Sequence, residues 1–297
     1  MLLRIVTALV LIPVVVALVW WGPPEALAAV AAGIALAAMW EFFSLGERVG
    51  MAGFRKWTMV CAAGIFWAQF LAGMRPYRAF DFSIGEYGFQ HVAFPRNSSV
   101  TVELVLVVFL FGAVTIGLAT RRPLQDVLPA ISISSASLLF VALPFSFLVR
   151  VNEMSGGSTE GGLVGRQLIL FTLCLIWAGD MLAYFVGKAL GRVPMAPVLS
   201  PKKTWEGAIA NFAASLLVAV FFARWMQVET LTMLIIAGVA NIAGQAGDLI
   251  ESAYKRGAVV KDSGTLVPGH GGVLDRVDSL ILAAPVVWIL WGIFGAR

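Results

Sequence analysis

The chain alternates long apolar stretches with short polar connections. A helix that crosses a membrane needs about 20 mostly apolar residues, and about nine stretches of the chain meet that requirement. They are residues 2–21, 25–45, 57–74, 100–119, 127–149, 167–188, 206–226, 230–250 and 279–296. The pattern therefore predicts an all-α polytopic membrane protein with about nine transmembrane helices.

Composition supports membrane residence and excludes other classes of protein. Hydrophobic residues make up 60% of the chain and charged residues 13%, with a mean hydropathy of +0.89. Soluble domains are about half apolar and about a quarter charged. The formal net charge is +4, but no basic stripe interleaved with aromatic residues indicates nucleic acid as a partner. Cys61 and Cys174 both lie in apolar stretches, which excludes a disulfide framework.

Basic residues predict the orientation, because the cytoplasmic loops of membrane proteins are enriched in Lys and Arg. With the N-terminus in the cytoplasm, 14 of the 21 Lys and Arg residues fall on the cytoplasmic side. An odd number of spans then places the C-terminus outside. We divide the chain into N-terminal helices with an external loop (1–99), a middle helix pair (100–166) and a C-terminal catalytic domain (167–297).

Ionisable residues concentrate between positions 248 and 278, in a chain where they are scarce. Asp248, Ser252 and Lys255 share one face at the end of an apolar helix. Asp275 and Asp278 are three residues apart at the start of the last helix. Carboxylates in this number bind Mg²⁺, and Mg²⁺ together with Lys and Arg is what a polyphosphate needs. The alternative interpretation is a solvated loop with two carboxylates placed favourably at a helix N-terminus.

A glycine-rich turn, residues 268–272 (Pro-Gly-His-Gly-Gly), lies inside this segment. Glycine lets backbone N–H groups approach an anion closely, although such a turn alone is a weak indication. The carboxylates on both sides and the basic residues around it strengthen the case for a phosphate site. The basic residues of the segment are Lys255, Arg256, Lys261 and Arg276.

Polar residues of interest also occur upstream. Asp180 lies inside an apolar stretch, where a carboxylate costs about 2.5–3.5 kcal/mol to insert, which favours a functional residue over a polar tie between helices. Residues 200–204 (Ser-Pro-Lys-Lys-Thr) precede a helix that begins near Trp205. Its free N–H groups can hold a phosphate, and the alternative is membrane anchoring by the lysines. Glu41 is predicted to be interfacial or interhelical rather than catalytic.

Residues 252–278 resemble the motif of the phosphatidate cytidylyltransferase family, whose members are also called CDP-diacylglycerol synthases. The match begins with Ser-Ala-Tyr-Lys-Arg at 252–256, continues through Lys-Asp at 261–262, and ends with Pro-Gly-His-Gly-Gly-Val-Leu-Asp-Arg-Val-Asp at 268–278. Tyr254 and Val267 depart from the family's usual residues at packing positions only. The resemblance extends to residues 180–187, 200–207 and 247–249, so it covers the C-terminal half in motifs and the N-terminal half in hydropathy.

The resemblance implies an enzyme of the bacterial inner membrane whose active site faces the cytoplasm. It would transfer the cytidylyl group from CTP to phosphatidic acid, giving CDP-diacylglycerol and pyrophosphate. It would act as a homodimer with Mg²⁺ and a second, monovalent ion such as K⁺. The metal ligands implied are Asp248, Asp275 and Asp278, which are counted as catalytic together with Lys261, Asp262, His270 and Arg276. The substrate-binding residues implied are Asp180, Ser200, Lys202, Lys203, Thr204, Ser252, Lys255, Arg256, Gly271 and Gly272.

Two other functions are weaker alternatives. A CTP-dependent kinase of a lipid alcohol attacks the γ-phosphorus of CTP and needs a base such as Asp262, but the closeness of the motif argues against it. A secondary transporter tends to show internal repeats and binding residues at helix breaks in both halves. The sequence shows no repeat, and its ionisable residues gather in the C-terminal half.

Overall fold

Each predicted apolar stretch corresponds to helix in the computed structural model, which describes residues 2–73, 98–120, 123–154, 163–267 and 271–295. A π-helical turn, η1 (Leu138–Ala142), joins α5 to α6 without a break. The helices are α1 (Leu2–Trp21), α2 (Pro24–Arg48), α3 (Arg55–Gly73), α4 (Ser98–Ala119), α5 (Leu124–Ser137), α6 (Leu143–Asn152), α7 (Leu163–Leu190), α8 (Trp205–Met226), α9 (Thr230–Gly257) and α10 (Leu274–Phe294).

Within the described residues, seven helices are long and apolar enough to cross a membrane. They are α2, the Val102–Ala119 part of α4, the continuous Leu124–Asn152 segment, α7, α8, α9 and α10, while α1 contributes a shorter apolar helix, Leu9–Trp21. The prediction of a polytopic helical membrane protein is therefore confirmed. The count of nine spans, the orientation and the division into three parts stay predictions.

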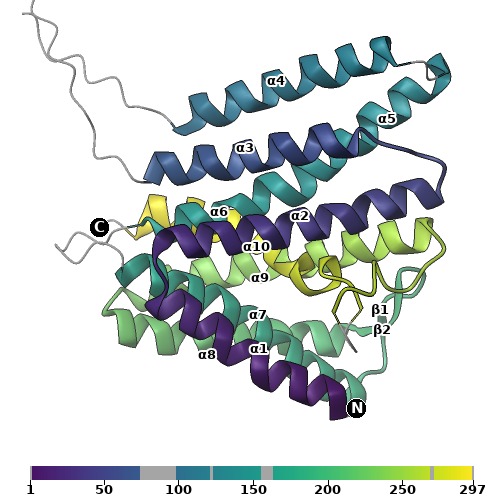
Figure 1. Ribbon diagram of the computed structural model, residues 1–297. Coiled ribbons are helices and arrows are strands. Elements are labelled where there is room, and N and C mark those ends of the chain that lie inside the picture. The colour runs from purple at the N-terminus through teal and green to yellow at the C-terminus, as the bar shows by residue number, and fades with distance from the viewer. Residues whose placement is uncertain (1, 74–97, 121–122, 155–162, 268–270, 296–297) are drawn as a thin grey trace, which may run out of the picture.

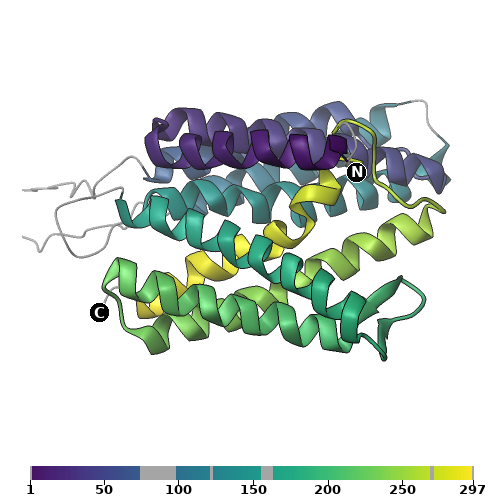
Figure 2. The same cartoon turned by 90° about the horizontal axis from the view of Figure 1, so that it is seen from below.

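The helices run side by side, and their connections gather at two opposite ends (Figures 1 and 2). One end, which we call the hairpin end, carries the α2–α3, α4–α5 and α9–α10 connections. It also carries an antiparallel hairpin between α7 and α8, formed by β1 (Pro194–Ala196) and β2 (Ser200–Thr204). The α1–α2 and α8–α9 connections lie at the opposite end. The connections for which the basic residues predict a cytoplasmic location thus share one end.

Two helix pairs shape the C-terminal half: α7 packs along α8, and α9 packs along α10. Thr204 caps α8, because its Oγ1 accepts the Gly207 N–H at 3.2 Å. Gly247 permits the close approach of α9 to α10, since a Cβ at this position would collide with the carbonyl oxygen of Asp278. Helices approach closely where small residues line their contact. This close contact brings the Asp248 region of α9 against the start of α10.

Candidate active site

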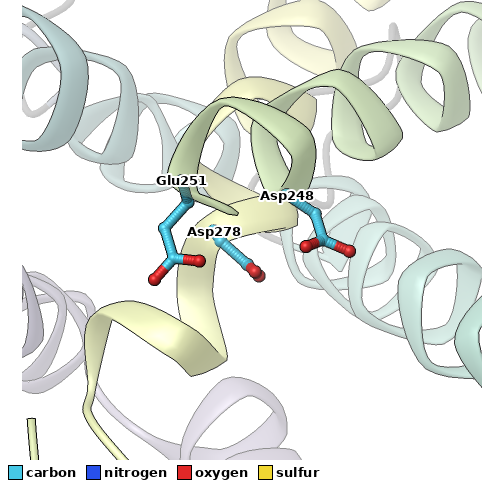
Figure 3. Close-up of side chains that lie close together, drawn as sticks. All are labelled: Asp248, Glu251 and Asp278. Carbon is cyan, nitrogen blue, oxygen red and sulfur yellow. The ribbon is translucent and has the colours of Figure 1, made fainter. Parts of the chain in front are cut away.

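Three carboxylates from two helices meet near the hairpin end, and we call them the carboxylate group. Asp248 and Glu251 lie one turn apart on α9, Asp278 lies on α10, and Figure 3 shows their side chains close together. One oxygen of each lies within 4.8 Å of the others. Glu251 is completely buried. Carboxylates at such distances repel one another and lose hydration, so the group needs cations beside it.

Two lysines supply part of that positive charge. Lys203, from β2, forms an ion pair with Asp248, and Lys255, one turn after Glu251 on α9, forms an ion pair with Glu251. Lys255 also pairs with Asp275 at 2.6 Å. Its side chain is only 12% exposed. Lys255 is therefore held between two carboxylates that are themselves buried.

The carboxylate group keeps unused capacity to bind a cation. Glu251 Oε1 is buried and accepts no hydrogen bond, while Oε2 is engaged in the ion pair with Lys255. Buried polar atoms without a partner are rare in folded proteins. Carboxylate oxygens are the ligands that hard divalent cations such as Mg²⁺ prefer. The donor set of Asp248, Glu251 and Asp278 therefore fits such a cation.

Asp275 lies outside the carboxylate group, which differs from the sequence prediction. Its Oδ1 pairs with Lys255, and its Oδ2 accepts the Gly272 N–H at 2.8 Å and the Ser263 N–H at 3.0 Å. Both oxygens are thereby engaged by donors of the protein. The carboxylate that joins Asp248 and Asp278 is Glu251, and Asp275 instead orders the α9–α10 connection.

A cavity of about 250 Å³ lies beside the carboxylate group. Its wall includes Asp180 of α7, Lys202 and Lys203 of β2, and Asp248 of α9. Tyr184, also on α7, lines the cavity and is 60% exposed. Asp180 thus lies on a cavity wall, which is the environment that a carboxylate inside an apolar stretch requires.

Side-chain amides of α8 and α9 also line this cavity. Asn211 donates to Asp180 Oδ1 at 3.2 Å, and Gln245 donates to Asn241 Oδ1 at 2.6 Å. Asn241 in turn donates to the Ser215 hydroxyl at 2.6 Å. Buried polar groups need such partners, and this network ties α7, α8 and α9 together around the cavity.

The other predicted residues lie around the hairpin end. Arg256 Nε donates to the Leu199 carbonyl at 3.1 Å, which ties α9 to the hairpin that Ser200 helps to form. Gly271 has a φ of +84°, and a Cβ there would lie 2.9 Å from Asp275 Oδ2, so glycine is required. Of the remaining residues, Ser252 is buried, Lys261, Asp262 and Arg276 are exposed, and His270 lies outside the described residues.

Glu41, on α2, reaches this site from the N-terminal half of the chain. Its side chain is 3% exposed. Its carboxylate accepts the N–H groups of Val273 at 3.0 Å and of Leu274 at 2.9 Å, and the Ser263 hydroxyl at 2.8 Å. The first N–H groups of a helix have no partner within it, so Glu41 caps α10 from another helix. Of the two predicted roles, interfacial or interhelical, these contacts show the interhelical one, but the sequence did not predict the contact of Glu41 with the candidate site.

Known proteins match this chain over nearly its whole length. The model of the cytidylyltransferase family matches residues 2–294. A phosphatidate cytidylyltransferase of Brucella abortus is 33% identical over 299 residues, which cover 98% of this chain and 93% of that protein. One of Haemophilus influenzae is 45% identical over 41% of this chain and 44% of its own length. One of Bacillus subtilis is 35% identical over 52% of this chain and 56% of its own length. Because the family match and the Brucella match both extend almost from end to end, the chain belongs to the cytidylyltransferase family.

Proposed function

We propose that the protein is a phosphatidate cytidylyltransferase that works at the carboxylate group and the cavity beside it. Family membership and the relative from Brucella support the reaction, in which the cytidylyl group of CTP passes to phosphatidate to give CDP-diacylglycerol and pyrophosphate. One observation carries the location of the site. Three carboxylates, two lysines and a cavity with charged and amide side chains in its wall come together beside the hairpin of an otherwise apolar helical bundle.

In this proposal Asp248, Glu251 and Asp278 hold a divalent cation such as Mg²⁺. When bound, that cation neutralises phosphate oxygens and aligns the triphosphate. Asp275 keeps Lys255 beside the group and is not itself a ligand. If all are ionised, these four carboxylates face two ammonium groups, and one divalent cation balances the excess negative charge. The second, monovalent ion such as K⁺ stays a prediction.

Both reactants are anions, so the residues of the site act chiefly by positioning and by neutralising charge. An oxygen of the phosphatidate phosphate forms a bond to the α-phosphorus of CTP. The bond between that phosphorus and the oxygen bridging to the β-phosphorus breaks, and pyrophosphate leaves. The phosphate of phosphatidate is already ionised near neutral pH, so no strong general base is needed.

Different residues around the cavity bind different parts of the two substrates. Lys202 and Lys203 neutralise the phosphates, and Asp180 with the amides that line the cavity binds polar groups of the nucleotide. Tyr184 and Phe185 are exposed. In this proposal they face the bilayer, and the acyl chains of phosphatidate remain in the lipid. Direct contacts of Lys261, Asp262, His270 and Arg276 with substrate stay predictions.

Labelled CTP tests the reaction and separates it from the kinase alternative. Purified protein in detergent is incubated with phosphatidate, Mg²⁺ and CTP labelled at either the α- or the γ-phosphorus. We expect the α-label to enter the lipid and the γ-label to leave as pyrophosphate. With a lipid alcohol as acceptor, transfer of the γ-label to the lipid would instead identify a kinase. Absence of label in the lipid in both cases would contradict both functions.

We also propose that α1 and α3 cross the bilayer, giving nine spans in a bacterial inner membrane. The N-terminus and the hairpin end then face the cytoplasm, where CTP is found, and the C-terminus lies outside. The bias of basic residues and the shared location of the connections at the hairpin end support this orientation. The homodimer implied by the resemblance stays a prediction.

Cysteine labelling tests the orientation. Val198→Cys and Val259→Cys place exposed thiols at the hairpin end, and Glu229→Cys places one between α8 and α9, all in a background that lacks Cys61 and Cys174. In intact spheroplasts a membrane-impermeant thiol reagent should label only the Glu229→Cys protein. All three should react after the membrane is opened. Labelling of the two hairpin-end cysteines in intact spheroplasts would reverse the orientation.

A further inference from the structure

A chain of contacts leads from Glu41 to the carboxylate group through side chains. The Ser263 hydroxyl lies 2.8 Å from Glu41 Oε2 and 3.1 Å from Asp275 Oδ2. Asp275 pairs with Lys255, and Lys255 pairs with Glu251. A single hydroxyl thus joins the carboxylate on α2 to the pair that holds the Glu251 side chain.

A second route runs through the backbone of α10. Glu41 accepts the N–H groups of Val273 and Leu274 at the start of this helix. Asp278 lies about one turn further along the same helix. The position and direction of the first turn of α10 therefore determine where the Asp278 carboxylate lies relative to α9.

The surroundings of Glu41 are fitted to a carboxylate. A Cβ on Gly264 or on Gly272 would overlap with the Glu41 side chain, so glycine is required at both positions for the carboxylate to fit. Oε1 accepts one N–H group, and Oε2 accepts an N–H group and the Ser263 hydroxyl. A glutamine here would turn an NH₂ group, which only donates, towards at least one of these donors.

From this geometry we infer that Glu41 is a positioning residue for the carboxylate group. It fixes the position of Asp278 through the first turn of α10. It fixes the position of Glu251 through the contacts of Ser263, Asp275 and Lys255. In this inference Glu41 acts through these residues and not by contact with substrate or metal. The inference rests on the proposed function in one respect, namely that the carboxylate group binds a divalent cation. Partners that orient metal ligands commonly change metal affinity or activity by about 10–100-fold when they are replaced.

The test compares Glu41→Gln with Glu47→Gln in the whole chain purified in detergent. Glu47 is a matched control, because it lies on the same helix and is exposed, paired with Arg55 at 3.1 Å. Mn²⁺ binding is measured from the electron paramagnetic resonance signal of the free ion. We expect Glu41→Gln to raise the Mn²⁺ dissociation constant about tenfold or more. The half-saturating Mg²⁺ concentration for cytidylyl transfer should rise in parallel, while Glu47→Gln behaves as wild type.

Two further variants keep the test decisive if Glu41→Gln does not fold. Ser263→Ala should also raise the Mn²⁺ dissociation constant, but by a smaller factor than Glu41→Gln. It removes the route through the hydroxyl and leaves the cap of α10. Glu41→Asp, which keeps the charge, should lie between wild type and Glu41→Gln. Unchanged Mn²⁺ binding in Ser263→Ala and in every Glu41 variant that folds would overturn the inference, as would absence of Mn²⁺ binding to wild type. If the Glu41 variants bind Mn²⁺ more weakly than wild type, but wild type itself transfers no cytidylyl group, the inference is supported and the proposed reaction is overturned.

Discussion

Asp278→Asn is expected to lower the rate of cytidylyl transfer by about a hundredfold to a thousandfold, because a bound metal supplies several kcal/mol of transition-state stabilisation and each ~1.4 kcal/mol is a factor of ten. Asparagine keeps the shape of the side chain and loses the charge. Asp248→Asn and Glu251→Gln should act in the same direction, since the three carboxylates share one site. The measurement is the rate of transfer against Mg²⁺ or Mn²⁺ concentration for each purified variant.

The metal dependence separates this expectation from simple misfolding. A large excess of Mn²⁺ should restore part of the activity of at least one variant, by mass action on a weakened site. Asp126→Asn, at an exposed position on α5, removes the same charge away from the site and should leave the rate unchanged. Full activity of wild type in excess chelator, or normal rates in all three site variants, would contradict the proposed metal site.

Lys255→Met is expected both to destabilise the protein and to lower its activity. Methionine keeps most of the length of the side chain but leaves Glu251 and Asp275, which are 0% and 5% exposed, without their shared ammonium group. Removing one partner of a buried ion pair costs about 3–5 kcal/mol. The change should lower the thermal midpoint in detergent, and activity should fall by more than about a hundredfold because the carboxylate group loses its arrangement.

A double-mutant cycle assigns this effect to the ion pair. Asp275→Asn should cost less stability in the Lys255→Met background than in wild type, because it then removes a charge that is already unpaired. Lys56→Met, at an exposed position on α3, is the control for loss of a lysine and should leave both stability and activity near wild type. Equal costs of Asp275→Asn in the two backgrounds would show that the pair contributes nothing.

Hydropathy predicted the helices well because a membrane-crossing segment must satisfy its own backbone hydrogen bonds, so length and apolar character nearly decide its structure. The meeting of Asp248 with Asp278 was also predictable, since both lie near the hairpin end on consecutive helices. The third member of the group was not. The available signal for Glu251 was its spacing from Asp248, which places both side chains on one helix face. The sequence does not show that Lys255 and Ser263 engage Asp275 and so keep it out of the carboxylate group.

Contacts between segments that lie far apart in the sequence could not be predicted. Glu41 lies 232 residues before Val273, and no periodic pattern in the chain specifies which helix ends pack together. The hairpin was missed for a different reason. Residues 194–204 are mostly exposed or partly exposed and contain three prolines, so they lack the alternating apolar pattern by which short strands are recognised.

The capping of α10 by a side chain of α2 has a consequence for biosynthesis. Chains leave the ribosome N-terminal end first, so α2 is made and inserted long before α10. During that interval Glu41 has no helix to cap, and the carboxylate group is incomplete because Asp278 has not yet been synthesised. A nascent chain therefore carries no working site until its last helix joins the bundle, and a chain released before that point stays inactive.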